Sequence, residues 1–299
     1  MKKRPLSPLT VIFSLMLTLM TLTSISVSHA KESAKVLTQW LPFELVKRHI
    51  MVDVKIKGVT VKAMLDTGAS MSLIAKKTAK KVGLRRSKMK TTIVGVAGRQ
   101  EVSLSRGVSV ELPGLFKKKM NLMILPDSKW FDMIIGMDYL AHGVIQFDYV
   151  NKRLRLATPN AFVFDPASAI PLIKRHLHFF VTATIDNVPF DMLLDTGNSA
   201  KVVLPYDSVK DTPLYEQIRG KEAKSLGAVG ITKHEFKVFA NVSNHFKIGP
   251  YTLENVGYFV ASPETPVKGE LSILGYDILK HFVVTLDLIN RKLYLSAPS

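Results

Sequence analysis

Polar and apolar residues alternate along two separate stretches of the chain. Residues 52–56, Val-Asp-Val-Lys-Ile, have the period of two that is typical of a half-buried strand. Gly58 then marks a turn, and residues 59–65 continue as a second strand that ends in Ala-Met-Leu. Residues 181–194 repeat this pattern, with Asn187 at the turn. The pattern therefore predicts a β-hairpin at each of these places.

The two stretches are copies of one another. Residues 52–70 read VDVKIKGVTVKAMLDTGAS and residues 181–199 read VTATIDNVPFDMLLDTGNS, at a constant offset of 129. Further on, IIGMDYLAHGVIQFDYVNKRLRL at 134–156 returns as ILGYDILKHFVVTLDLINRKLYL at 273–295. We interpret this as a duplication that gives two all-β lobes. Their expected bounds are 46–157 and 172–299, with a proline-containing linker at 158–171.

Few helices are expected. The convincing one runs from Ile74 to Val82, and Gly83 follows it as a C-terminal stop. Asp138 and Asp277 each precede a short apolar turn that we expect them to cap. Asp148 and its copy Asp287 each stand three residues before an asparagine, and this spacing predicts a hairpin turn.

The N-terminus has the layout of an export signal. A basic start at residues 2–4 precedes an apolar stretch at 9–22 and small residues that end at Ala30. We predict a signal peptide over residues 1–30 and a periplasmic or secreted protein, with an uncleaved membrane anchor as the alternative. Residues 31–45 are expected to be either an added edge strand or a short pro-segment.

The amino-acid composition limits which stabilising bonds, metal sites and partners the protein can have. Among 299 residues 47% are hydrophobic, enough for a packed core, and cysteine is absent, which excludes disulfides and thiolate metal sites. The net charge of +17 favours anionic partners, such as a cell-envelope surface or acidic substrates. Nucleic acid is not expected as the partner of an exported protein.

Each copy delivers an Asp-Thr-Gly from the end of an apolar strand, at Asp66 and Asp195. A single such tripeptide is typical of an ordinary turn, but two at matching places in a duplicated chain indicate chemistry. Packing of the copies about a pseudo-twofold axis would bring the two carboxyls together, where they share one proton. Such a pair can activate a water molecule for peptide hydrolysis, and it needs no metal or organic cofactor. Small Gly68 and Gly197 would allow backbone N–H groups to approach the carboxyls.

The sequence resembles the retropepsin-like and pepsin-like aspartic peptidases, through these two loops and two apolar-apolar-Gly triplets. The resemblance covers the chain from about residue 50 onward, and the helix followed by Val-Gly-Leu is similar to bacterial retropepsin-like members. It implies catalytic aspartates, threonines bonded across the two lobes, triplets packed beneath the loops, and glycine-bearing flaps over the cleft. The implied residues are Asp66, Thr67, Gly68, Ser70, Asp195, Thr196, Gly197 and Ser199 in the loops, Ile134, Ile135, Gly136, Ile273, Leu274 and Gly275 in the triplets, and Gly95, Val96, Gly98, Gly227 and Gly230 in the flaps.

Two residues depart from the family pattern. Ala69 stands where pepsins carry a hydroxyl residue that steadies the ionised carboxylate. Without that bond the pKa of the pair should rise, so we predict activity in mildly acidic to near-neutral conditions. Asn198, at the corresponding place of the second loop, is uncommon there and leaves the support of Asp195 open.

The predicted function is that of an aspartic endopeptidase, acting as a monomer on a polypeptide in extended conformation. The alternative is a non-catalytic module that uses the same fold to bind peptides or envelope components. A peptidase built from two chains is a third option, although one chain already supplies both loops. His176 and His178 share one strand face, but no third ligand is evident nearby, so no metal site is expected.

Overall fold

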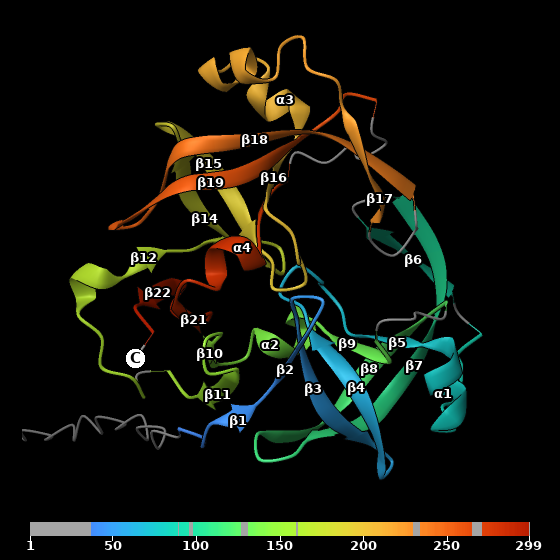
Figure 1. The fold of residues 1–299 in the computed structure, drawn as a ribbon. Helices are drawn as coiled ribbons and strands as arrows, with labels where there is room; N and C mark the ends of the chain where they lie inside the picture. Colours follow the sequence, from blue (N-terminus) through green and yellow to red (C-terminus); the bar gives the residue numbers. More distant parts are fainter. Residues whose placement is uncertain are drawn as a thin grey trace, which may run out of the picture. The chain divides into compact units, whose positions relative to one another are not determined.

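Two sheets with the same strand order make up most of the structure (Figure 1). This computed structural model describes residues 37–88, 90–95, 98–126, 131–159, 161–229, 234–264 and 271–298. The expected signal peptide, Val96 and Gly230 lie outside these residues. The described residues belong to one compact unit.

We call the first of these sheets the N-terminal sheet. Its eight strands, in spatial order, are β2 (Glu44–Val46), β3 (His49–Ile56), β4 (Val59–Leu65), β9 (Met133–Ile135), β5 (Leu73–Ala75), β8 (Phe116–Leu125), β7 (Gly98–Leu112) and β6 (Lys90–Gly95). Gly58, at φ +82°, makes the predicted turn between β3 and β4. The sheet folds back on itself, because β3 also pairs with β7.

The C-terminal sheet repeats this order strand for strand. It runs β13 (Ile173–Arg175), β14 (His178–Ile185), β15 (Val188–Leu194), β20 (Ser272–Leu274), β16 (Val202–Leu204), β19 (Tyr251–Ala261), β18 (His234–Ile248) and β17 (Lys224–Val229). Asn187, at φ +68°, stands at the turn that corresponds to Gly58. In this sheet β14 also pairs with β18, as β3 pairs with β7 in the other.

A third sheet joins the closing hairpins of both copies. Its order is β1 (Leu41–Pro42), β11 (Arg153–Ala157), β10 (Val144–Asp148), β21 (Val283–Asp287), β22 (Lys292–Ser296) and β12 (Ile170–Pro171). Strands β10 and β21 are antiparallel neighbours, with Val144 opposite Asp287. The predicted hairpin turns are confirmed, since Asp148 Oδ1 accepts from Asn151 N at 3.0 Å and Asp287 Oδ1 from Asn290 N at 2.9 Å.

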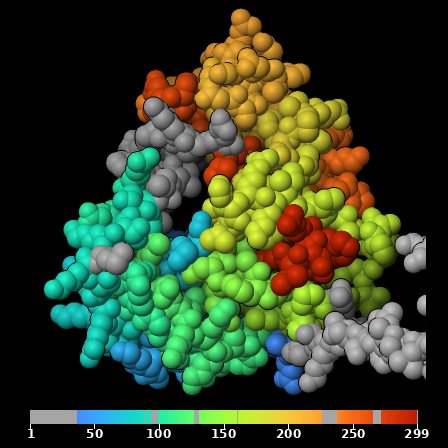
Figure 2. Space-filling model, turned by 180° about the vertical axis from the view of Figure 1, so that it is seen from behind, coloured from blue at the N-terminus to red at the C-terminus, as the bar shows by residue number. Residues whose placement is uncertain are grey.

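The segments that flank the first copy also enter this sheet. Leu41 lies at its edge opposite Leu154, so part of residues 31–45 is an added strand in the structure. The expected linker contains a 3₁₀ turn, η1 (Pro166–Ser168), and ends in β12, which pairs with β22. Figure 2 shows the red C-terminal residues lying against the yellow-green chain near residue 170.

The helices are short. Helix α1 (Lys76–Lys81) is shorter than predicted, because Ile74 and Ala75 pair as part of β5. Gly83 ends it with a φ of +62°, as expected. The other helical segments are α2 (Met137–Leu140), α3 (Tyr206–Val209), η2 (Pro213–Gln217) and α4 (Tyr276–Leu279). No helix in the described ranges is long and apolar enough to cross a membrane.

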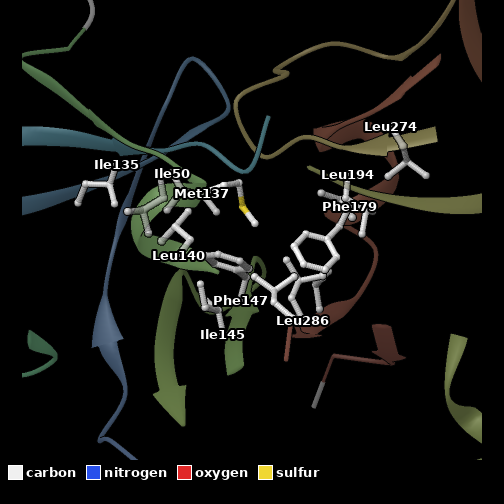
Figure 3. Packing of buried hydrophobic residues seen from close by; sticks show 14 of the residues in the cluster. Ile50, Ile135, Met137, Leu140, Ile145, Phe147, Phe179, Leu194, Leu274 and Leu286 are labelled. Carbon is white, nitrogen blue, oxygen red and sulfur yellow. The ribbon is translucent and has the colours of Figure 1, made fainter. Parts of the chain in front are cut away.

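One hydrophobic cluster connects the three sheets. Figure 3 shows Ile50 and Ile135 of the N-terminal sheet, Leu194 and Leu274 of the C-terminal sheet, and Phe147 of the third sheet between them. All of these side chains are at most 2% exposed. The two strands that lead into the aspartates, β4 and β15, are therefore anchored in one shared and tightly packed core.

Candidate active site

Buried strands deliver both aspartates to equivalent places. Asp66 follows β4 and Asp195 follows β15 directly. Each of these strands has a parallel neighbour, with Leu65 beside Ile135 and Leu194 beside Leu274. The backbone N–H of each aspartate donates to the carbonyl of that neighbour at 3.0 Å, which fixes where the loop begins.

Four hydrogen bonds cross between the two loops through the threonines. Thr67 Oγ1 donates to Leu194 O at 2.7 Å and accepts from Thr196 N at 3.0 Å. In the reciprocal pair, Thr196 Oγ1 donates to Leu65 O at 2.8 Å and accepts from Thr67 N at 3.1 Å. Both threonines are 3% exposed, so water cannot replace these bonds. The structure thus brings together the two tripeptides that the sequence places 129 residues apart.

Each glycine lies against the carboxyl of the opposite loop. A methyl group on Gly68 would come within 2.5 Å of Asp195 Oδ1, and one on Gly197 within 2.5 Å of Asp66 Oδ1. Carbon and oxygen do not approach so closely without bonding, so a side chain at either position would displace a carboxyl. The same contacts place each carboxyl against the glycine of the opposite loop, and each carboxyl alters the pKa of the other.

The two carboxyls differ in their electrostatic surroundings. Burial raises the pKa of Asp66, while the Asp195 carboxyl and then the N–H groups of Gly68 and Ala69, at 2.9 and 3.0 Å from Oδ1, act in the opposite direction. Burial and then the charge on Asp66 raise the pKa of Asp195 well above its usual value, opposed mainly by Gly197 N at 2.8 Å. The direction of these shifts favours Asp66 as the carboxyl that ionises first and Asp195 as the one that keeps the shared proton.

The triplets lie beneath the loops. A methyl group on Gly136 would lie 2.7 Å from the carbonyl oxygen of Ala69. A methyl group on Gly275 would collide with the backbone and side chain of Asn198. Met137 N donates to Ala69 O at 2.8 Å, and in the second copy Tyr276 N donates to Asn198 O at 2.9 Å. These contacts hold the residue that follows each Asp-Thr-Gly.

Beyond the aspartates, the two loops are supported differently. In the first, Ser72 Oγ donates to Asp138 Oδ1 at 2.7 Å and accepts from Gly136 N at 3.0 Å. Asp138 therefore receives a side-chain hydrogen bond from Ser72, whereas the helix-cap bond predicted for it is absent from α2. Sheet register places Val202 where the first loop has Ser72, because Leu73 and Val203 face the corresponding triplet residues. Valine cannot make such bonds, and sequence reasoning missed this difference.

Asn198 supports its own loop instead of the carboxyl. Its Oδ1 accepts from Ala200 N at 3.0 Å and its Nδ2 donates to Lys201 O at 3.3 Å. This closes a side-chain turn just after the second Asp-Thr-Gly. Neither of these bonds involves the side chain of Asp195.

The serines of the two loops also differ. Ser70 Oγ lies 3.0 Å from His178 Nε2, and the same nitrogen lies 3.0 Å from Gly68 O. No hydrogen bond of Ser199 is present among the described residues. His178 was considered only as a metal ligand on sequence grounds. The offset of 129 pairs His178 with His49, just as it pairs Asp195 with Asp66, but the His49 ring lies against Val46 O in its own turn, so the repeat does not predict this contact.

The flap candidates lie on two long hairpins. Gly95 and Gly98 are the last paired residues of the β6–β7 hairpin. Gly227 lies in β17, near the end of the β17–β18 hairpin, where Val229 pairs with His234. The tips that hold Val96 and Gly230 fall outside the described residues. Within the described ranges no group of three or more His, Asp or Glu side chains is placed to hold a metal ion.

Comparison with known proteins also relates this chain to aspartic proteases. Residues 52–142 match the family described as "gag-polyprotein putative aspartyl protease", a range that contains the first aspartate loop and the first triplet. The chain is also 31% identical over 164 residues to the Protein DDI1 homolog of Leishmania major. That alignment covers 50% of this chain and 41% of the relative, so the chain spans about two fifths of the relative's length.

These similarities support an aspartic protease-like family for the chain and a protease-family function at that level. The mostly β structure is consistent with a retropepsin-like fold. Catalysis by the paired carboxyls depends on the geometry of the site and not on the fold alone.

Proposed function

We propose that the chain is an aspartic endopeptidase whose two lobes, related by a pseudo-twofold axis, each contribute one catalytic aspartate. The single observation that carries this proposal is the pair of loops locked face to face, with Thr67 and Thr196 bonded across and Asp66 beside Asp195. Placing two buried carboxyls together is costly, and such a cost is typical of a functional site.

The electrostatic difference assigns the roles. Ionised Asp66 accepts a proton from a water molecule, whose oxygen attacks the peptide carbonyl carbon. Asp195 donates its proton to the carbonyl oxygen and so stabilises the tetrahedral intermediate. When the C–N bond breaks, the proton on Asp66 passes to the departing nitrogen and Asp195 recovers its proton from the oxygen. The pair ends in its starting state, and no cofactor takes part.

The pH range of activity follows from the same assignment. Turnover requires Asp66 ionised and Asp195 protonated. Because the pKa of Asp66 is raised, activity should be lost on the acid side at a higher pH than an ordinary aspartate would give. Because the pKa of Asp195 is raised further, activity should persist toward neutral pH and fall when Asp195 ionises. Mildly acidic to near-neutral conditions are therefore expected.

We further propose that the substrate binds as an extended strand between the β6–β7 and β17–β18 hairpins, with its backbone paired to them. The protein would act as a monomer after export and cleavage of the signal at residue 30. Without residues 1–30, which hold three basic and no acidic residues, its net charge of +14 would favour anionic envelope surfaces or acidic substrates. The specificity pockets would be those next to the two loops.

The test uses purified protein and a mixed peptide library scanned from acid to neutral pH. Wild type is compared with Asp66→Asn and Asp195→Asn, and with Asp207→Asn as a matched control whose carboxyl is 78% exposed on α3. We expect cleavage by wild type and the control, and none by either loop variant. A wild type that cleaves nothing at any pH, also when it begins at residue 31 or 46, would reject peptidase activity in favour of a peptide-binding module.

A further inference from the structure

His178 links the C-terminal sheet to the first aspartate loop. It begins β14, and its half-buried ring reaches Gly68 and Ser70, which lie 110 and 108 residues earlier in the chain. Gly68 O is a carbonyl and can only accept, so Nε2 carries the hydrogen in this contact. Ser70 Oγ lies at the same distance and holds the ring in place. Nε2 is protonated in the cation and in one of the two neutral tautomers, so the bond to Gly68 O forms in the neutral state only when the ring adopts that tautomer.

The carbonyl that receives this bond belongs to a particular amide. Gly68 C=O and Ala69 N–H are the two ends of one planar peptide group. Ala69 N donates to Asp66 Oδ1 at 3.0 Å. The ring, the amide and the carboxylate therefore form one continuous line of hydrogen bonds. A donor at the carbonyl end polarises the amide and strengthens its N–H as a donor.

The second copy lacks this arrangement. His49 is the counterpart of His178, but its Nδ1 lies 3.3 Å from Val46 O in its own turn. Within the described residues no side chain bonds to Gly197 O. Only the first loop therefore has a histidine bonded to the amide beside its aspartate. The same loop carries Asp66, the carboxyl that is expected to ionise first.

Few charged groups face the ring. Burial is the largest effect and lowers the pKa of His178, the bond to Gly68 O and the charge of Asp66 oppose it, and His176 on the same turn adds to the lowering. The charge of His49 lowers the pKa of Asp66. Arg175, also on this turn, is paired with Asp191.

We propose that His178 is a positioning residue of the peptidase, which holds and polarises the Gly68–Ala69 amide and thereby makes Asp66 the ionised member of the pair. This inference rests on the proposed function only for its consequence in catalysis. The effect on the ionisation of Asp66 exists whether or not the protein cleaves peptides.

The deciding measurement therefore needs no substrate. Carboxyl ¹³C resonances of labelled aspartate are followed by NMR titration in the full chain, and assigned with Asp66→Asn and Asp195→Asn. His178→Ala removes both the bond and the charge, and should raise the lower apparent pKa of the pair by about one unit, the scale of one hydrogen bond to an ion. His178→Gln keeps an N–H donor without charge and should give a smaller rise.

His176→Gln is the matched control, because His176 is exposed on the same turn. It should titrate like wild type. In the peptidase assay, His178→Ala should shift the acid limb of kcat/KM upward by the same amount and lower kcat roughly tenfold. The acid limb is the informative readout, since a merely structural role would lower activity equally at every pH.

Unchanged carboxyl titration in both His178 variants would overturn the inference, and so would an equal shift in His176→Gln. If the titration shifts as expected while wild type cleaves no peptide, the role of His178 in ionisation stands and the proposed function fails. If wild type cleaves and the titration does not move, the proposed function stands without this inference.

Discussion

The two Asp-Thr-Gly loops have the same tripeptide but not the same surroundings. Asp66 receives two backbone donors at 2.9 and 3.0 Å, and the second of these belongs to an amide held by His178. Asp195 receives Gly197 N at 2.8 Å, the N–H of Asn198 acts in the same direction, and burial and then the charge of Asp66 raise its pKa well above the usual value. Ser72 supports the first loop from below, whereas an asparagine side chain closes the second. Duplication supplies the pair, and small differences around it separate the acid from the base.

The largest expected effect comes from a feature that both loops share. Gly68→Ala would place a methyl against the Asp195 carboxyl, and Gly197→Ala would do the same to Asp66. Displacing a reacting group by about 1 Å costs on the order of 100-fold in rate. We expect each variant to lose at least that much kcat/KM in the peptide assay, with folding checked by circular dichroism.

The two glycine variants also test whether the loops are equivalent in space. Similar losses are expected, because the contacts are reciprocal. Near-normal activity of either alanine variant would show that the opposite carboxyl does not lie where the structure has it.

The next effect concerns the threonine bonds. Thr67→Val keeps the shape of the side chain but leaves Thr196 N and Leu194 O buried without a partner. Unpaired buried groups cost about 1–3 kcal/mol, so we expect the free energy of unfolding to fall by about 2 kcal/mol in urea denaturation. Thr196→Val should cost the same, because its two bonds mirror those of Thr67.

Thr67→Ser and Thr196→Ser serve as controls, since serine retains the hydroxyl. They should lose much less stability than the valine variants. The double valine variant should cost less than the sum of the two, because both pairs of bonds hold the same two loops together. Full additivity would indicate that the two hydroxyls act independently.

The sequence predicted those parts of the structure that repeat. The offset of 129 located the aspartates, threonines and glycines, and period-two alternation located β3, β4, β14 and β15. It also gave the turns at Asp148 and Asp287, because their bonds are local. The expected helix was placed two residues early, since Ile74 and Ala75 are equally suited to a buried strand.

What the sequence did not predict depends on contacts between distant residues. The joining of both closing hairpins through β10 and β21 requires side-by-side strands that lie about 140 positions apart. The bonds of Ser72 with Asp138 and of His178 with Gly68 break the repeat, so comparing the copies could not reveal them. Their geometry is set by sheet register, which local patterns do not specify between remote strands.

A smaller effect is expected on the stability of Asp195→Asn, which should increase at neutral pH although the variant loses its activity. The folded-state pKa of Asp195 is raised, so the folded protein binds more protons than the unfolded chain and its stability falls as pH rises toward that pKa. Asp195→Asn removes this penalty. We expect it to be more stable than wild type at neutral pH by on the order of 1 kcal/mol, and no more stable in acid.

Thermal unfolding at several pH values gives this measurement, and Asp66→Asn sharpens the comparison. Because the pKa of Asp66 is raised less than that of Asp195, its asparagine variant should gain less stability at neutral pH. A larger gain in Asp66→Asn would reverse the assignment of acid and base.

The smallest effect is expected at Ala69, where a hydroxyl residue would alter the pH dependence of activity. Ala69 N already donates to Asp66 Oδ1 at 3.0 Å, so a hydroxyl on the same residue stands close to that carboxylate. Ala69→Thr supplies such a hydroxyl, and Ala69→Val is the control of the same shape without it. A hydrogen bond to the charged form lowers the pKa of a carboxyl. The acid limb of kcat/KM should therefore lie lower in the threonine variant than in the valine variant, by about half a pH unit. Coincident acid limbs would mean that Asp66 is not the group whose ionisation limits activity in acid. In that case the difference between the loops would have to be assigned the other way, with Asp195 as the base.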